Sequence, residues 1–154
     1  MYGIQPLPLQ ISSRENECAT SCAARTAYRN GAPRLVTFCS DVGIRYLPLA
    51  NGDEDEIRLL ATLAGHDPEP LIRNTPKVIR KDWFKLGAAD IKFSAFRRTK
   101  PRVCPICISE HGPQNRQNTA YQTGLLQLLS VRTCMKHQSV LQDLPNAEGV
   151  GAAL

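Results

Sequence analysis

The sequence predicts a mainly α-helical N-terminal part, with a helix-turn-helix-like unit, followed by a small zinc-binding C-terminal part of the zinc-finger or ribbon type. Apolar residues recur at helical spacing in residues 15–30 and again in residues 53–65. Two pairs of residues with metal-ligand spacing then follow near the C-terminus. We therefore expect a helical region over residues 1–100, a zinc-finger region over residues 101–145 and a flexible tail over residues 146–154.

The first helix is expected over residues 15–30, after an extended, proline-bearing lead-in over residues 1–14. Gly31 follows it and can take the left-handed conformation that ends many helices. Cys18 and Cys22 are four residues apart, which places both on one face of this helix. Because the neighbouring sequence supplies no further metal ligands, we interpret them as core residues.

A second helical pattern begins at Asp53 and ends at Gly65. Asp53 and Glu56 have the spacing of a capping box, in which each side chain accepts a hydrogen bond from the backbone of the other residue. The stretch before this helix is less informative. Residues 35–49 fit either a helix or a strand, and residues 48–52 are predicted to form a turn.

A third, short helix is expected after Asp67, which can cap it, with Pro68 at its first position. The two consecutive helices match a helix-turn-helix, since small Ala61 permits their close approach and apolar Leu71 anchors the second one. A plain helical hairpin in an all-α core is an equal alternative. His66, in the turn, is interpreted as a solvated loop residue.

Positive charge gathers in residues 77–102, which hold nine basic and two acidic residues in a chain of net charge +5. This asymmetry favours a nucleic-acid partner, and a solvated basic surface is the alternative. The candidate phosphate contacts are Arg80, Lys81, Arg97, Arg98, Lys100 and Arg102. Aromatic residues in the same segment can stack on bases, but the core face of an amphipathic stretch is the preferred interpretation. These aromatic residues are Trp83, Phe84, Phe93 and Phe96.

The two pairs near the C-terminus predict one structural zinc ion. The candidate ligands are Cys104, Cys107, Cys134 and His137. In each pair two residues separate the ligands, so both can reach one metal. Pro105 has no N–H, and the other amides of that turn are free to point at thiolate sulfur. Four protein ligands leave no position for a catalytic water. His111 is a competing ligand with poorer spacing, and residues 125–131 are an apolar strand or helix expected to pack on the zinc unit.

Cysteine usage predicts a cytoplasmic, reducing compartment. Of the six cysteines, three belong to the ligand pairs, and Cys18, Cys22 and Cys39 lie far from them among core-type residues. No apolar run approaches the ~20 residues that span a membrane, so we expect no membrane association. The N-terminus lacks the charged and apolar regions of a secretory signal.

The chain resembles the TniQ family, whose members are related to TnsD and select targets for Tn-type bacterial transposons. The resemblance rests on residues 102–107, an apolar run, Cys134-x-x-His137 and Leu141. Upstream, family members open with a Leu-Pro segment, as at Leu7-Pro8, and continue with a helix of the form Glu-Ser-x-x-Ser-Trp-x-x-Arg before an Asn-Gly end. Glu17, Ser21, Arg25 and Asn30-Gly31 fall in that register, and residues 60–75 resemble the family's helix-turn-helix region.

Two departures from the family pattern stand out. Cys18, Ala19 and Cys22 occupy positions where the family usually has Ser, Leu and Trp, so the first helix packs with less bulk. The family also commonly follows its Cys-x-x-His pair with a Cys-Pro-x-Cys that starts a second zinc unit, whereas residues 144–147 here contain no cysteine. We therefore interpret the chain as a short form, either a minimal adaptor or a truncated remnant.

The resemblance implies an adaptor rather than an enzyme. Such proteins link a target-recognition element, which is DNA or an RNA-guided CRISPR effector complex, to a TnsC-like AAA+ ATPase. The residues agree, because the sequence has no glycine-rich phosphate loop and no carboxylate cluster of the two-metal nuclease type. The alternative is a stand-alone DNA-binding transcriptional regulator, and a thiol enzyme is the least favoured class. The sequence leaves open whether the chain forms a homodimer.

Overall fold

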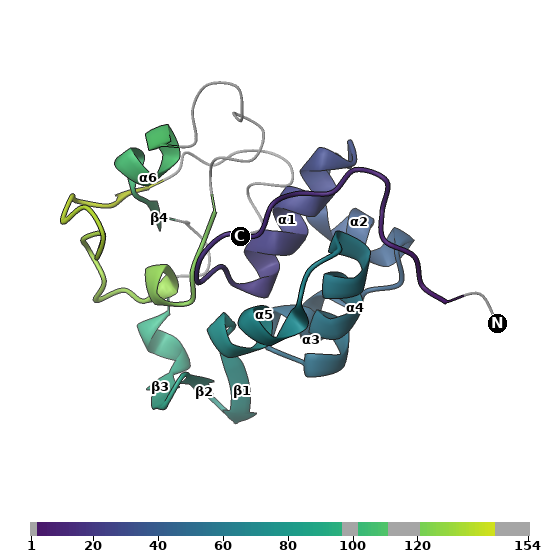
Figure 1. The fold of residues 1–154 in the computed structure, drawn as a ribbon. Coiled ribbons are helices and arrows are strands. Elements are labelled where there is room, and N and C mark those ends of the chain that lie inside the picture. The colour runs from purple at the N-terminus through teal and green to yellow at the C-terminus, as the bar shows by residue number, and fades with distance from the viewer. Residues whose placement is uncertain (1–2, 97–101, 111–120, 144–154) are drawn as a thin grey trace.

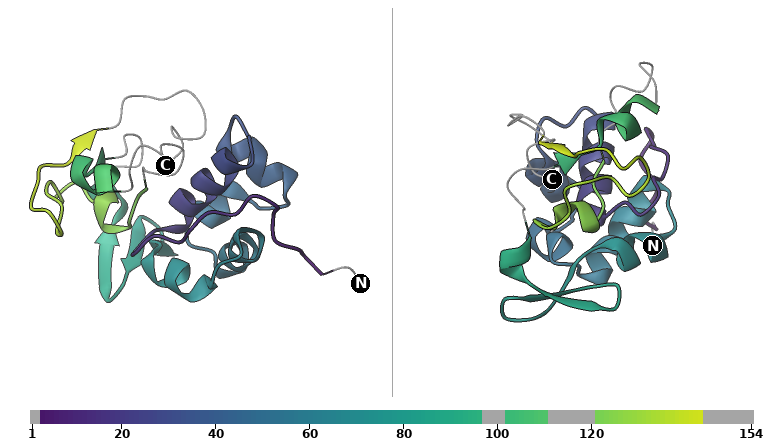
Figure 2. Two further views of the ribbon diagram at one scale, coloured as in Figure 1. Left: turned by 45° about the horizontal axis from the view of Figure 1, so that its top comes forward. Right: turned by 90° about the vertical axis from the view of Figure 1, so that its left-hand side faces the viewer.

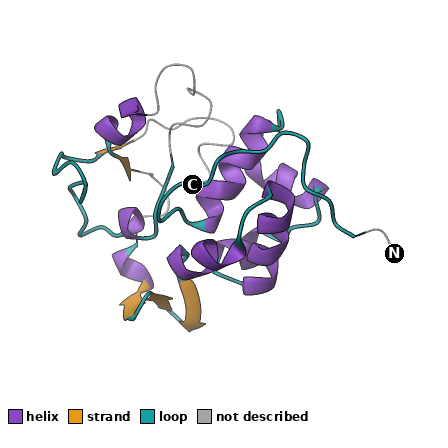
Figure 3. Cartoon of the chain, viewed as in Figure 1, coloured by secondary structure: helices purple, strands orange, loops and turns teal. Residues whose placement is uncertain are grey.

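Five helices in succession form the N-terminal half of the computed structural model, which describes residues 3–96, 102–110 and 121–143. They are α1 (Ala19–Arg29), α2 (Leu35–Asp41), α3 (Tyr46–Ala50), α4 (Glu54–Ala64) and α5 (Pro68–Asn74). We call residues 3–74 the helical part. The expectation of a mainly helical N-terminal half is confirmed, and the lead-in of residues 3–14 runs across these helices without regular structure (Figures 1 and 3).

The rest of the described chain is built from short strands and helical turns. The strands are β1 (Lys77–Arg80), β2 (Trp83–Leu86), β3 (Ala89–Lys92), β4 (Arg102–Val103) and β5 (Gln142–Asp143). The helical turns are η1 (Phe93–Ala95), α6 (Pro105–Glu110) and η3 (Leu125–Gln127). We call residues 102–110 and 121–143 the metal part, which lies beside α1 and the β1–β3 sheet (Figure 2). Within the described residues, no helix has the length and apolar character needed to cross a bilayer.

The ends of α4 and α5 are fixed by the local signals expected from the sequence. The Asp53 carboxylate accepts hydrogen bonds from the amides of Asp55 and Glu56, at 3.1 and 3.2 Å, and so caps α4. Gly65 ends the helix in the left-handed conformation, with φ 70°. Asp67 then caps α5 through the amide of Glu69. The predicted N-cap residues of both helices are confirmed.

The second half of the expected capping box does not form. The Glu56 carboxylate instead accepts hydrogen bonds from the backbone N–H and Nε of Arg45, at 2.9 and 2.5 Å. The amide of Asp53 donates to the carbonyl of Pro48. Glu56 therefore ties α4 to the start of α3, because a buried carboxylate gains more from the nearby guanidinium than from one amide.

Residues 35–49, which the sequence left open between helix and strand, contain α2, a short connection and most of α3. Pro48 lies inside α3, so the turn predicted over residues 48–52 is confined to Asn51 and Gly52. Gly52 has φ 80°, and a Cβ at this position would lie 2.6 Å from the Cα of Lys77. The turn therefore requires glycine both for its conformation and for the close approach of β1.

The helical part has a continuous apolar core with one buried ion pair beside it. All five helices and Ile11 of the lead-in contribute buried side chains to the core. Next to it, Arg25 donates to the Glu17 carboxylate at 2.7 Å, and the Ser21 hydroxyl donates to the other oxygen of Glu17 at 2.7 Å. Both charged side chains are at most 4% exposed. Glu17, Ser21 and Arg25, which match the family pattern of the first helix, thus form one hydrogen-bonded network.

His66 lies in the α4–α5 loop as expected, but it is not fully solvated. Its ring is half-buried, with Nε2 2.8 Å from the carbonyl oxygen of Ile11 and Nδ1 3.7 Å from the Sγ of Cys22. The imidazole thus connects the lead-in, the α4–α5 turn and α1. By contrast, Cys18 and Cys22 are fully buried, which confirms their interpretation as core residues.

An antiparallel β1–β3 sheet follows α5, where the sequence predicted only a helical region. Lys85 pairs with Lys77 and Asp90, Phe84 with Val78 and Ile91, and Trp83 with Arg80 and Lys92. Since residues paired across strands share a face, one side of the sheet is apolar around Phe84 and the other carries most of the charged residues. Phe84 packs against Phe93 and Phe96, with ring centroids 5.7 and 5.1 Å apart.

Residues 121–129 connect the metal part to the helical part and to the β1–β3 sheet. The amide of Cys18 donates to the carbonyl of Gln122, whose own amide donates to Ser21 Oγ. Leu128 pairs with Phe96 in an isolated bridge. A Cβ on Gly124 would lie 2.7 Å from both the carbonyl oxygen of Asn74 and the side chain of Leu86, so only glycine fits against these segments.

Candidate metal centre

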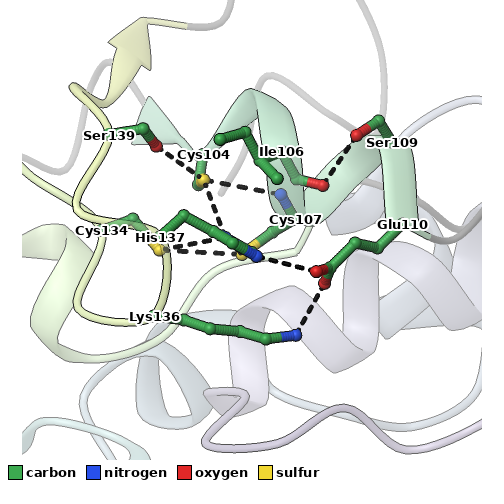
Figure 4. Close-up of polar contacts among 9 residues, drawn as sticks. All are labelled: Cys104, Ile106, Cys107, Ser109, Glu110, Cys134, Lys136, His137 and Ser139. Atoms are coloured by element: carbon green, nitrogen blue, oxygen red, sulfur yellow. Dashed lines mark hydrogen bonds and ion pairs between the residues drawn. The ribbon is translucent and has the colours of Figure 1, made fainter.

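Two short backbone elements bring the expected ligands together. Strand β4 pairs with β5 and leads directly into Cys104, and α6 carries Cys107 (Figure 4). The second pair lies in a turn in which the amide of Cys134 donates to the carbonyl of Ser139, and that of Gln138 to the carbonyl of Cys134. Gln138 has φ 52°, a left-handed conformation that lets the chain reverse immediately after His137.

The four ligand atoms of Cys104, Cys107, Cys134 and His137 all lie within 4.8 Å of one another. Cys107 Sγ is 3.7 Å from Cys134 Sγ, and His137 Nδ1 is 3.3 to 3.7 Å from the three sulfurs. A tetrahedral metal about 2.3 Å from sulfur and about 2.0 Å from nitrogen has edges of roughly 3.5–3.8 Å. These residues therefore fit a single metal ion with four protein ligands.

The proline in the first pair has the consequence expected from the sequence. Pro105 opens α6, and the amide of Cys107 points at the sulfur of Cys104, 3.5 Å away. The Ser139 hydroxyl lies 3.1 Å from the same sulfur. Hydrogen bonds of this kind disperse the negative charge of a thiolate, so the structure is prepared for an anionic Cys104.

Glu110 is a residue of this site that sequence reasoning missed. Its carboxylate lies 2.8 Å from His137 Nε2 and accepts a hydrogen bond from Lys136 Nζ at 2.7 Å. A carboxylate on the outer nitrogen keeps a proton on Nε2 and leaves Nδ1 free to bind metal. The signal was present in the spacing, because Glu110 follows Cys107 by three residues on α6 and so shares its face.

The electrostatics of the four groups are interdependent. Burial alone would raise the pKa of Cys104, but hydrogen bonds from Ser139, the Cys107 amide and His137 lower it to about 6. Burial and then the neighbouring thiols raise the pKa of Cys107 to about 12. The Glu110 carboxylate, followed by Cys104, raises the pKa of His137 to about 9. A divalent cation at the centre of this cluster would neutralise the negative charge of the thiolates and so favour their deprotonated form.

The apolar run at residues 125–131 packs on the metal part, as expected. It forms η3, then the bridge residue Leu128 and a turn at residues 129–130. Leu126 and Val131 contact the buried cluster of Cys104, Cys134 and Leu141. His111, the competing ligand, lies outside the described residues, as do the boundary at residue 145 and the tail.

The candidate phosphate contacts are placed unevenly. Arg80 and Lys81 are exposed on the β1–β3 sheet, and residues 97–101 lie outside the described part of the chain, which leaves Arg97, Arg98 and Lys100 undescribed. Arg102 is 7% exposed, and its guanidinium donates to the carbonyl oxygens of Leu128 and Leu129. The expectation that Arg102 is an exposed cation is wrong, because strand pairing draws it inward.

The aromatic residues of the basic segment divide between core and surface. Phe84 and Phe96 are buried, as the preferred interpretation required, whereas Phe93 is 48% exposed. Trp83 is half-buried on the charged side of the sheet, with Arg80 and Lys92 over its ring at 4.7 and 5.6 Å. The two phenylalanines thus serve the core, and Trp83 is associated with cations.

Comparison with known proteins gives one match. The family model TniQ matches residues 8–141, a span that includes the Glu17–Arg25 network and all four ligands. No curated protein and no solved structure matches significantly. Because the matched span covers most of the 154 residues, the chain belongs to the TniQ family.

Proposed function

We propose that this protein is a target-selection adaptor in transposition. It links a target complex, formed by DNA or by an RNA-guided effector, to a TnsC-like AAA+ ATPase that regulates the transposase. The observation that carries the proposal is the family match over residues 8–141, since the family suggests a role in target selection. The hydrogen bonds of Gln122 with Cys18 and Ser21, which join the metal part to the helical part, suit a connector between larger assemblies.

We infer that the metal is zinc and that its role is structural. Three thiolates and one imidazole are a common ligand set of structural zinc sites, and four protein ligands leave no coordination position for a substrate. When bound, zinc supplies coordination bonds between α6 and the turn at residues 134–137. The chain's own residues do the rest: Glu110 orients the imidazole, and Ser139 and the Cys107 amide hydrogen-bond to Cys104.

An adaptor rather than an enzyme is also favoured by the remaining thiols. Burial raises the pKa of Cys18, Cys22 and Cys39, in the case of Cys39 to about 11. Thiols with raised pKa values are protonated at neutral pH and are weak nucleophiles. Substituting Ser for each of these cysteines is therefore expected to affect folding and not any chemistry.

The adaptor function is tested by co-purification. The tagged protein is expressed with a TnsC-like AAA+ ATPase and with a candidate target-recognition component, and retention of each is measured at rising salt. We expect the ATPase to be retained specifically. Failure of the purified, zinc-loaded protein to retain either component would reject the proposal.

The second candidate is a stand-alone DNA-binding regulator, which the α4–α5 pair followed by a basic sheet favours. A regulator requires sequence preference in addition to salt-dependent binding. Selection of bound sequences from a random duplex library is therefore combined with the ATPase co-purification. An enriched motif without retention of the ATPase supports the regulator, whereas retention of the ATPase supports the adaptor, with or without a motif.

A further inference from the structure

The β1–β3 sheet presents one strongly cationic face that no other part of the described chain covers. Figure 1 shows the sheet at the lower edge of the molecule, below α5 and at the opposite edge from α6. Strand register places Lys77, Arg80, Lys85 and Lys92 on the same face as Trp83. Lys81 is exposed in the turn between β1 and β2.

Some of these cations are neutralised within the protein and others are not. Lys77 pairs with Glu54 at 2.7 Å, and Lys85 lies 3.8 Å from Asp90. Among the described residues, Arg80, Lys81 and Lys92 have no carboxylate partner. Arg80 and Lys92 come from the two outer strands and converge over Trp83 of the central strand. The ring holds two charges together that would otherwise separate.

The apolar face of the same sheet explains why the cations are held in place. Phe84 is buried against Phe93 and Phe96, and the amide of Val78 donates to the carbonyl of Asn51 at 2.9 Å. The backbone of β1 also lies against Gly52. The backbone of β1 thus fixes the sheet to the helical part, and Phe84 packs the apolar face on the segment that follows β3, so the charged face is left exposed.

The helix that a helix-turn-helix protein would place in the major groove lacks this character. The N-terminal residues of such a recognition helix contact base edges. Here α5 begins with Pro68, Glu69 and Pro70, and the Glu69 carboxylate pairs with Arg58 at 2.9 Å. Prolines offer no donor, and a carboxylate repels phosphate. The sheet, and not α5, is the surface of the described chain that suits a polyanion.

We propose that the charged face of the β1–β3 sheet binds the phosphate backbone of a nucleic acid, with Arg80, Lys81 and Lys92 as its main contacts. The proposal deepens the nucleic-acid role in the proposed function and rests on it for the choice of nucleic acid over other polyanions. Since cations already lie over the Trp83 ring, this residue orients charge and does not stack on a base. Binding is therefore independent of sequence.

The test measures fluorescence anisotropy of labelled duplex DNA, single-stranded DNA and duplex RNA with the full-length, zinc-loaded protein at about 50 to 200 mM salt. Comparison of the affinities for the three nucleic acids identifies which backbone the protein prefers. The Arg80→Gln/Lys92→Gln variant is expected to bind duplex DNA about tenfold or more weakly at low salt, with the slope of log affinity against log salt reduced by about two. The matched control, Arg29→Gln/Arg34→Gln, removes the same charge from exposed positions on the helical part and should change neither quantity.

A second variant, Lys81→Gln/Lys85→Gln, leaves both cation–ring contacts intact and is also expected to lower the slope. It keeps the test decisive if the first variant unfolds the sheet, which is monitored by circular dichroism. Wild-type slope in both sheet variants, or no binding of any nucleic acid by the wild-type protein, overturns the inference. Co-purification of the ATPase with the sheet variants is scored separately, so the adaptor function can stand when the inference fails.

Discussion

In the helical part, the lead-in and five helices bury a continuous apolar core, whereas the described metal part gathers its buried apolar side chains around Cys104, Cys134 and Leu141. Two of those three residues belong to the candidate metal site. Hydrophobic burial at about 25 cal/mol per Å² can hold the first region but supplies little in the second. One chain thus uses two means of stabilisation, and the comparison predicts that they fail under different perturbations.

Removing the ligands should have the largest effect and should be confined to one region. Binding of structural zinc supplies about 10–16 kcal/mol in small zinc-binding peptides. We expect Cys104→Ser/Cys134→Ser to lose the metal and unfold the metal part while α1 to α5 remain folded. Elemental analysis measures the zinc, and hydrogen exchange measures each region. Near-stoichiometric zinc in the double variant would contradict the assignment.

Breaking the buried ion pair should instead destabilise the helical part. Glu17→Gln leaves the Arg25 guanidinium buried without a countercharge, which typically costs about 3–5 kcal/mol. The free energy of unfolding is measured by denaturant titration of the zinc-loaded protein. As a control, Arg58→Ala removes the exposed pair with Glu69 and should cost about 0–1 kcal/mol. Equal effects of the two changes would show that the Glu17 network is not a stabilising feature.

Matched leucine truncations compare the two cores directly. Leu60 is fully buried in α4, and Leu60→Ala is expected to cost about 2–5 kcal/mol. Leu141→Ala, beside the metal ligands, should cost about 2 kcal/mol or less because fewer apolar groups surround it. Denaturant titration of both variants with zinc bound gives the two values. A larger loss for Leu141→Ala would mean that the metal part depends on its apolar cluster.

Weakening the hydrogen bond that orients His137 should have the smallest effect, a loss of metal affinity without unfolding. Glu110→Gln keeps the shape of the side chain but weakens the hydrogen bond to His137 Nε2. Loss of such a partner typically lowers metal affinity 10- to 100-fold. Competition with a zinc chelator measures the affinity, and unchanged circular dichroism shows that the fold is retained. Lys136→Gln, which removes the other partner of Glu110, is the control and should change affinity less.

Local signals in the sequence determined the ligand set and the helix ends. Two residues between paired ligands, a carboxylate at each N-cap of α4 and α5, and Gly31 and Gly65 at the C-terminal ends of α1 and α4 act within a few residues. Their consequences hardly depend on the rest of the chain, which is why the helix ends and the grouping of the four Cys and His side chains agree with the predictions. The burial of Cys18 and Cys22 was predictable for the same reason, since helical spacing puts them on one face.

Tertiary structure alone decided the features that join distant segments. His66 meets Ile11 and Cys22, and Glu110 meets His137 across 27 residues. Arg102 is drawn inward by carbonyl groups at Leu128 and Leu129. The β1–β3 sheet was missed because its strands are short and its burial depends on Phe96 and residues beyond it. Such contacts form only when the folded chain has brought their partners together. Local spacing placed Glu110 on the face of Cys107, but it did not encode the contact with His137.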